Sequence, residues 1–148
     1  MTYCDSSFLT SLYVTTEGFN SQACREVEQF THAIPYTLLN ELELLNALHR
    51  GLGNHSLNQT VHDTIIREIE TDKADGLLQP TALNQIKLYE KARELSKKHT
   101  STLACRSLDI LHVASALILG AKKFASFDLR QRKLAVAVDL TLIPSRVV

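Results

Sequence analysis

Short apolar runs alternate along the whole chain with longer amphipathic segments. This alternation predicts strands separated by helices, which is the pattern of an α/β fold with a mostly parallel sheet. The predicted strands cover residues 2–4, 33–36, 77–78, 123–127 and 140–143. The predicted helices cover residues 6–14, 38–52, 58–73, 107–119 and 129–137, and a long polar helix that Thr81 caps and that continues to about His99. Pro35 weakens the second strand, because proline cannot donate a backbone hydrogen bond.

The length of 148 residues fits a single domain spanning residues 1–148, and 45% hydrophobic residues supply a proper core. Equal numbers of basic and acidic residues give zero net charge, which argues against nucleic-acid binding through bulk positive charge. A local basic rim or bound cations would still permit the chain to bind nucleic acid.

The three cysteines, Cys4, Cys24 and Cys105, stand far apart, and this spacing favours reduced thiols. With no basic-then-apolar leader and no long apolar run, we expect a cytoplasmic protein.

Two aspartates stand where predicted strands end. Asp5 follows the first strand directly, and Asp128 follows the run 123–127 and opens a helix. Ligands of open parallel sheets bind beyond the carboxyl ends of the strands, so both carboxylates are candidates for a functional site. Each is also well placed to cap the helix that follows it, and the sequence leaves both interpretations open.

Two further acids lie on helices. Asp109 belongs to a helix that is apolar on nearly every side, where an ionised carboxylate needs a partner or a cation. A simple interaction with the helix dipole is the alternative. Glu43 shares one helical face with Asn46, Ala47 and Arg50, although periodicity only modestly favours it over Glu41.

Carboxylates that converge on one point repel each other, and hard divalent cations such as Mg²⁺ offset that repulsion through oxygen ligands. Two such cations, roughly 4 Å apart, can activate a water and stabilise the leaving oxygen of a phosphodiester. If the four acids converge, this pattern therefore predicts metal-dependent phosphodiester hydrolysis.

Four segments together resemble the PIN-domain family, and in particular its VapC-like toxins. Residues 3–9 are similar to its first motif, a strand ending in Asp followed by Ser or Thr and an apolar pair. Residues 43–48 resemble its E-x-x-N-A-L motif, which selects Glu43. Residues 106–114 match the third motif closely, and residues 126–131 resemble the fourth, a strand leading to S/T-F-D.

The resemblance implies a three-layer α/β/α sandwich around a mostly parallel sheet of about five strands. It also implies an endoribonuclease that uses Mg²⁺ or Mn²⁺ bound by Asp5, Glu43, Asp109 and Asp128. Many such proteins are toxins of type II toxin–antitoxin pairs, so RNA, a cognate antitoxin and a second copy of the chain are the expected partners.

Five further residues are secondary candidates, each with an ordinary structural alternative. Ser6 can hydrogen-bond to a metal-bound water or cap a helix, and Asn46 can orient Glu43 or substrate or make a polar contact within its helix. Arg50 and Arg130 can bind phosphate or simply face solvent. His112 can bind metal, but donation to Asp109 or a place at an interface is favoured.

Other function classes fit less well. A haloacid-dehalogenase phosphatase needs a second Asp where Ser7 stands, and no glycine-rich phosphate loop is present. A receiver-type signalling domain would need paired acids at the first strand and a lysine after the last. Two alternatives remain open: a PIN-like module that binds RNA or protein without cutting, and a housekeeping RNA-processing nuclease.

Overall fold

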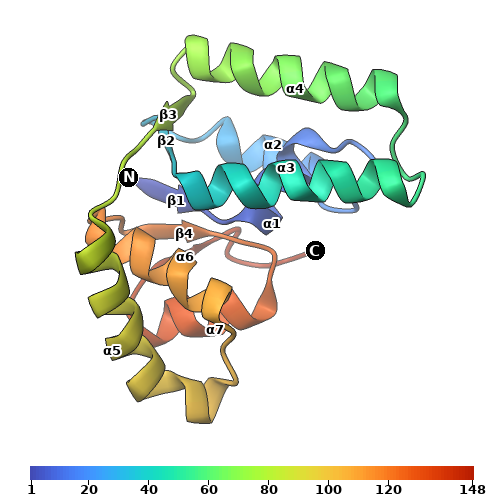
Figure 1. The fold of residues 1–148 in the computed structure, drawn as a ribbon. Coiled ribbons are helices and arrows are strands. Elements are labelled where there is room, and N and C mark those ends of the chain that lie inside the picture. Colours follow the sequence, from blue (N-terminus) through green and yellow to red (C-terminus); the bar gives the residue numbers. More distant parts are fainter.

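All five strands of the protein are parallel to their partners. The structure is a computed structural model that describes residues 1–148. β1 (Thr2–Cys4) pairs with β4 (Lys123–Ala125), which pairs in turn with β5 (Thr141–Ile143). β2 (Ile34–Tyr36) pairs with β3 (Leu78–Pro80), and this pair lies beside β1 (Figure 1). The α/β architecture with five parallel strands alternating with helices is therefore confirmed.

Seven helices connect the strands. They are α1 (Ser6–Tyr13), α2 (Asn20–Val27), α3 (Leu38–Gly53), α4 (Gln59–Ala74), α5 (Gln85–Leu103), α6 (Ser107–Ile118) and α7 (Leu129–Ala137).

Most predicted elements are present within a few residues of their expected bounds, and three details differ. Helix α2 was not predicted, because it is short and mostly polar and Ala23 is its only buried residue. The long helix α5 begins after Asn84, whose side chain accepts from Lys87 N–H, so Thr81 is not its cap. The fourth strand ends at Ala125, and residues 126–128 form a connection instead.

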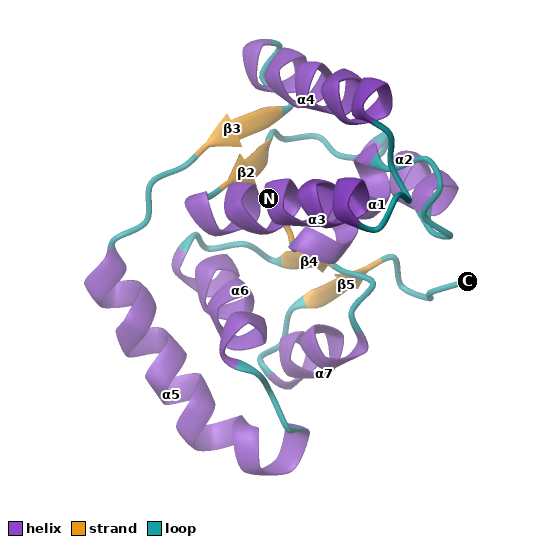
Figure 2. Cartoon of the chain, turned by 45° about the vertical axis from the view of Figure 1, so that its right-hand side comes forward, coloured by secondary structure: helices purple, strands orange, loops and turns teal.

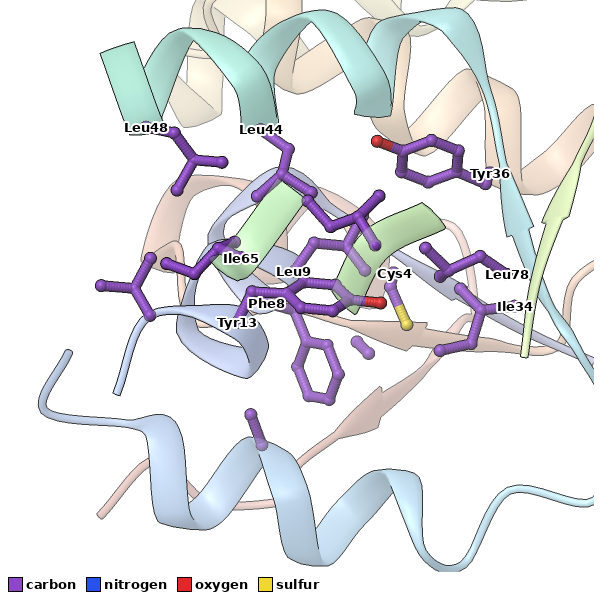
Figure 3. Packing of buried hydrophobic residues seen from close by; sticks show 14 of the residues in the cluster. Cys4, Phe8, Leu9, Tyr13, Ile34, Tyr36, Leu44, Leu48, Ile65 and Leu78 are labelled. Carbon is purple, nitrogen blue, oxygen red and sulfur yellow. The ribbon is translucent and has the colours of Figure 1, made fainter. Parts of the chain in front are cut away.

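The sheet separates two hydrophobic clusters. Neighbouring residues of a strand point to opposite faces, and Tyr3 belongs to one cluster while Cys4 belongs to the other. One cluster packs α1 to α4 against the sheet, and Figure 3 shows Leu44 and Leu48 extending into it from α3. The other cluster packs α5, α6 and α7, which lie together in Figure 2. The protein thus has helix layers on both faces of the sheet.

Pro35 explains why the five strands do not form one continuous ladder. Ile34 N–H donates to Leu77 O, and Tyr36 O accepts from Thr81 N–H, so both residues point their backbone groups towards β3. The intervening Pro35 must then face β1, where it has no N–H to donate. A side chain bridges the gap instead: Asn40 Nδ2 donates to Cys4 O at 3.0 Å.

None of the seven helices is both long and apolar enough to cross a membrane.

Asn40 tests how much this bridge contributes to stability. The residue is fully buried, and its Oδ1 also accepts from the backbone N–H and hydroxyl of Thr37. We expect Asn40→Ala to lower the free energy of unfolding by at least about 2 kcal/mol, because buried donors and acceptors lose their partners. Chemical denaturation measures this. Asn54→Ala, which removes only an exposed contact to Ser56 N–H, should change stability by less than about 0.5 kcal/mol; equal effects would contradict the role of Asn40.

Candidate active site

The carboxyl ends of β1 and β4 bring Asp5 and Asp128 to one edge of the sheet. Thr2–Cys4 pairs in register with Lys123–Ala125, and Asp5 N–H continues the ladder by donating to Ala125 O at 3.0 Å. The chain then turns into α1 after Asp5 and into α7 after Asp128. This edge is the one where ligands of parallel sheets bind.

Asp5 is fully buried and satisfied by three donors. Its Oδ1 accepts from Phe8 N–H at 2.8 Å and from Ser7 Oγ at 2.7 Å, and its Oδ2 accepts from Ser126 Oγ at 2.6 Å. Burial raises the pKa of Asp5 above its ordinary value, although His112 and these hydrogen bonds act in the opposite direction. Asp5 is thus the N-cap of α1, as the structural alternative expected, and it also links the ends of β1 and β4.

Asp128 caps the other helix that starts at this edge. Its Oδ1 accepts from the backbone N–H groups of Arg130 and Gln131 at 2.8 and 3.1 Å. Its Oδ2 lies 3.4 Å from Arg106 Nη2. The carboxylate therefore combines a capping role with a contact to a cation.

Asp109 lies in the first turn of α6 and is only 1% exposed. Its Oδ2 accepts from the Arg106 backbone N–H at 3.0 Å and from Nε at 3.2 Å, and its Oδ1 accepts from Nη2 at 3.2 Å. The hydrogen bond with Asp109 is the main cause that raises the pKa of Arg106. The guanidinium of Arg106 thus lies between Asp109 and Asp128 and neutralises part of their charge.

Glu43 reaches this site from α3, which lies next to α6 in Figure 2. Its Oε2 accepts from Ser6 Oγ at 2.7 Å and also contacts Nε2 of His112. Burial alone would raise the pKa of Glu43, but the hydrogen bonds from His112 and Ser6 hold it below its ordinary value. The structure therefore favours the ionised carboxylate at this position.

Three of the four acids line one end of an open cavity of about 1260 Å³. Glu43, Asp109 and Asp128 line it together with Arg106, whereas Asp5 lies behind the wall. The wall continues along α1 and the end of α3, where hydroxyl groups and Arg50 are exposed to the cavity. The site is thus a large polar hollow with its acids at one end, wide enough for an extended substrate.

The five secondary candidates occupy three kinds of position: in the cavity lining, outside it, and buried. Ser6 and Arg50 line the cavity, but Asn46 and Arg130 are exposed outside its lining. No hydrogen bond joins the side chain of Asn46 to Glu43. His112 is fully buried and contacts Glu43, Ser6 and Tyr3 rather than Asp109, the partner that the sequence favoured.

Sequence reasoning missed several residues that support these acids. Ser7 and Ser126 donate to Asp5, and the Tyr3 hydroxyl forms a hydrogen bond with His112 Nδ1. Gln131 lines the cavity with a buried Oε1 that has no hydrogen-bond partner. One signal was available: Ser126 is a polar residue between an apolar strand and Asp128. Nothing in the local pattern around Tyr3 indicates its contact, because His112 lies far away along the chain.

The chemistry of the donor set fits hard divalent cations. Three carboxylates line one cavity, and the guanidinium between two of them shows that these acids need a cationic partner. In the present conformation no three acidic, histidine or cysteine side chains surround a single point. Arg106 is 60% exposed, so the guanidinium between the two aspartates is open to solvent.

The chain is similar to known proteins both in its sequence profile and in its fold. The profile of the PIN domain matches residues 2–137. Among solved structures, the chain resembles the Mycobacterium tuberculosis toxin VapC20, whose description names it a sarcin–ricin loop cleaving toxin. That match has a TM-score of 0.68 and 14% identity, and covers 90% of this chain and 94% of the toxin chain. A search of curated proteins gave no significant match.

Arg106 tests the electrostatic balance of the site. In EDTA, we expect Arg106→Gln to lower the melting temperature by several degrees, because buried Asp109 loses its only salt bridge. Mg²⁺ or Mn²⁺ should raise the melting temperature of this variant more than that of the wild type, since a cation can replace the guanidinium. Thermal unfolding with and without metal measures both effects.

The matched control is Arg67→Gln on α4, where the guanidinium contacts only the exposed Thr64 hydroxyl. This variant should respond to metal as the wild type does. An equal metal response in all three proteins would show that Arg106 does not compete with cations.

Proposed function

Since this chain belongs to the PIN domain family, we propose that it is a divalent-metal-dependent endoribonuclease that hydrolyses RNA phosphodiester bonds. The observation that carries the proposal is the convergence of acids from separate segments on one cavity. Glu43 from α3, Asp109 from α6 and Asp128 before α7 line it, and Asp5 stands behind them. These four residues are the proposed metal ligands.

The bound Mg²⁺ or Mn²⁺ ions would supply an activated water and offset the charge that develops on the phosphate. The residues of the chain supply the geometry. Asp109 and Asp128 hold the cation position between α6 and the end of β4, and Glu43 approaches from the opposite helix. Ser6 fixes one oxygen of Glu43 by donating its hydroxyl proton.

The far part of the cavity is the proposed binding site for the RNA backbone. Arg50 supplies positive charge there, and hydroxyl groups supply neutral hydrogen bonds, which is the usual combination for phosphate and sugar contacts. The hydroxyl side chains of this wall are Thr10, Ser11, Thr16 and Ser56. Local contacts of this kind suit a chain with zero net charge.

We further propose that the protein is the toxin of a type II toxin–antitoxin pair. This rests on its structural likeness to VapC20, itself described as a toxin. A cognate antitoxin and a second copy of this chain are then the expected protein partners. Leu38 and Leu42 on α3 and Ile86 and Tyr89 on α5 expose apolar surface to which such partners could bind.

An RNA-cleavage assay tests the enzymatic proposal. Purified protein is incubated with labelled structured RNA, such as a tRNA pool, in Mg²⁺, Mn²⁺ or EDTA. We expect cleavage with either metal and none in EDTA, and a loss of more than about 100-fold in Asp109→Asn, because a ligand carboxylate is removed. Glu94→Gln, which changes an exposed acid on α5, should cleave as the wild type does.

The possible outcomes separate the competing functions. Equal cleavage by wild type and Asp109→Asn would mean a contaminating nuclease or a different site. Absence of cleavage together with intact RNA binding would favour the non-catalytic PIN-like module. Cleavage in vitro without growth arrest on induced expression in bacteria would favour a housekeeping nuclease over a toxin.

Arg50 tests the proposed RNA path separately from catalysis. We expect Arg50→Ala to weaken RNA binding about three- to tenfold and to make the salt dependence less steep by about one phosphate contact. Fluorescence anisotropy in Ca²⁺ or EDTA at several salt concentrations measures this. Arg67→Ala on α4, away from the cavity lining, should bind RNA as tightly as the wild type; an equal loss would place the path elsewhere.

A further inference from the structure

A buried chain of hydrogen bonds runs from the sheet to Glu43. Tyr3 on β1 and His112 on α6 are both fully buried. The Tyr3 hydroxyl lies 2.9 Å from His112 Nδ1, and Nε2 of the same ring contacts Glu43 Oε2. Ser6 Oγ lies 3.2 Å from His112 Nε2 and donates to the same oxygen of Glu43. No other acid of the site has a histidine as a hydrogen-bond partner.

The direction of these hydrogen bonds follows from what each group can donate. His112 Nδ1 is the hydrogen-bond partner of the fully buried Tyr3 hydroxyl, so the phenol donates its proton there. His112 Nδ1 then accepts, which places the ring proton on Nε2. An ionised carboxylate can only accept, and Glu43 Oε2 is the acceptor that Nε2–H meets.

This arrangement leaves the two oxygens of Glu43 in different states. Oε2 is held by both Ser6 and His112, whereas Oε1 has no hydrogen-bond partner within the protein. Because Glu43 lines the cavity, the free oxygen is the one that a cation can use. A carboxylate fixed in this way loses less side-chain freedom when a cation binds.

We propose that Tyr3 and His112 are positioning residues: Tyr3 selects the Nε2–H tautomer of His112, and His112 orients Glu43 towards the bound cation. Neither residue touches substrate or metal. The inference rests on the proposed function, because it assigns Glu43 the role of metal ligand. It adds a buried support to the site that reaches from the first strand of the sheet to the cavity.

Two substitutions at His112 test whether the Nε2–H group, and not the volume of the ring, orients Glu43. Gln can place its amide N–H close to the position of Nε2 and still donate to Glu43. Asn is shorter and reaches only the position of Nδ1, where it can bond to Tyr3 but not to Glu43. We expect Mn²⁺ affinity, measured without RNA by electron paramagnetic resonance, to fall about 10- to 100-fold in His112→Asn and less than about threefold in His112→Gln.

Tyr3→Phe tests the tautomer directly. Long-range ¹H–¹⁵N spectra of the wild type should show His112 with its proton on Nε2, the signal being identified by its loss in His112→Gln. In Tyr3→Phe we expect a mixture of tautomers and a threefold or larger loss of Mn²⁺ affinity. Tyr36→Phe, which removes a buried hydroxyl without a hydrogen-bond partner on β2, should leave both measurements unchanged.

The outcomes distinguish this inference from the proposed function. Unchanged tautomer and Mn²⁺ affinity in Tyr3→Phe, or equal affinities of the Asn and Gln variants, would overturn the positioning roles while leaving the nuclease intact. A wild type that binds no Mn²⁺ would overturn the metal-dependent function and the orientation of Glu43 towards a cation, and the spectra would still decide the tautomer. Circular dichroism and melting temperature of each variant verify that it is folded.

Discussion

The hydrogen bond between Ser126 Oγ and Asp5 Oδ2, at 2.6 Å, joins the two strand ends around which the site is built. The backbone ladder between β1 and β4 ends at this level, and the chains diverge into α1 and α7. Without this contact, a fully buried carboxylate would have one oxygen unsatisfied, at a cost comparable to the loss of a buried hydrogen bond. Ser126 also accepts from Asp128 N–H at 3.0 Å, so one hydroxyl sets the positions of two acids. One small side chain therefore contacts the capping residues of both helices.

Charge balance within the site is the second constraint. Four acids approach one end of a cavity, and three different kinds of contact reduce the repulsion among them. Asp5 accepts three hydrogen bonds, Glu43 is held by His112 and Ser6, and Asp109 and Asp128 share Arg106. These contacts stabilise the fold in the absence of metal. They also explain how a chain of zero net charge accommodates a strongly acidic cluster.

The sequence was sufficient to predict most elements and the strand-end positions of Asp5 and Asp128, because those features are local. Strand and helix periodicity located five strands and six of the seven helices, and the strand-end position of Asp5 and Asp128 followed from the parallel topology. Long-range contacts were not predictable in this way. The distance along the chain between Tyr3 and His112 hides their hydrogen bond, and nothing local indicates that Arg106 contacts Asp128. Helix α2 was missed because its residues are mostly polar and only Ala23 is buried.

The interruption of the sheet at Pro35 separates Glu43 from the other three acids. Asp5 and Asp128 stand on the β1–β4–β5 side, and Asp109 is bound to that side through Arg106. Glu43 stands on α3, which follows β2 directly and so belongs to the other side. Across this boundary the strands are joined by one side-chain amide rather than by a ladder of backbone bonds. Glu43 is nevertheless held on the other side, because its carboxylate contacts Ser6 of α1 and His112 of α6. Side chains at the cavity therefore align the two parts of the sheet where the backbone ladder is interrupted.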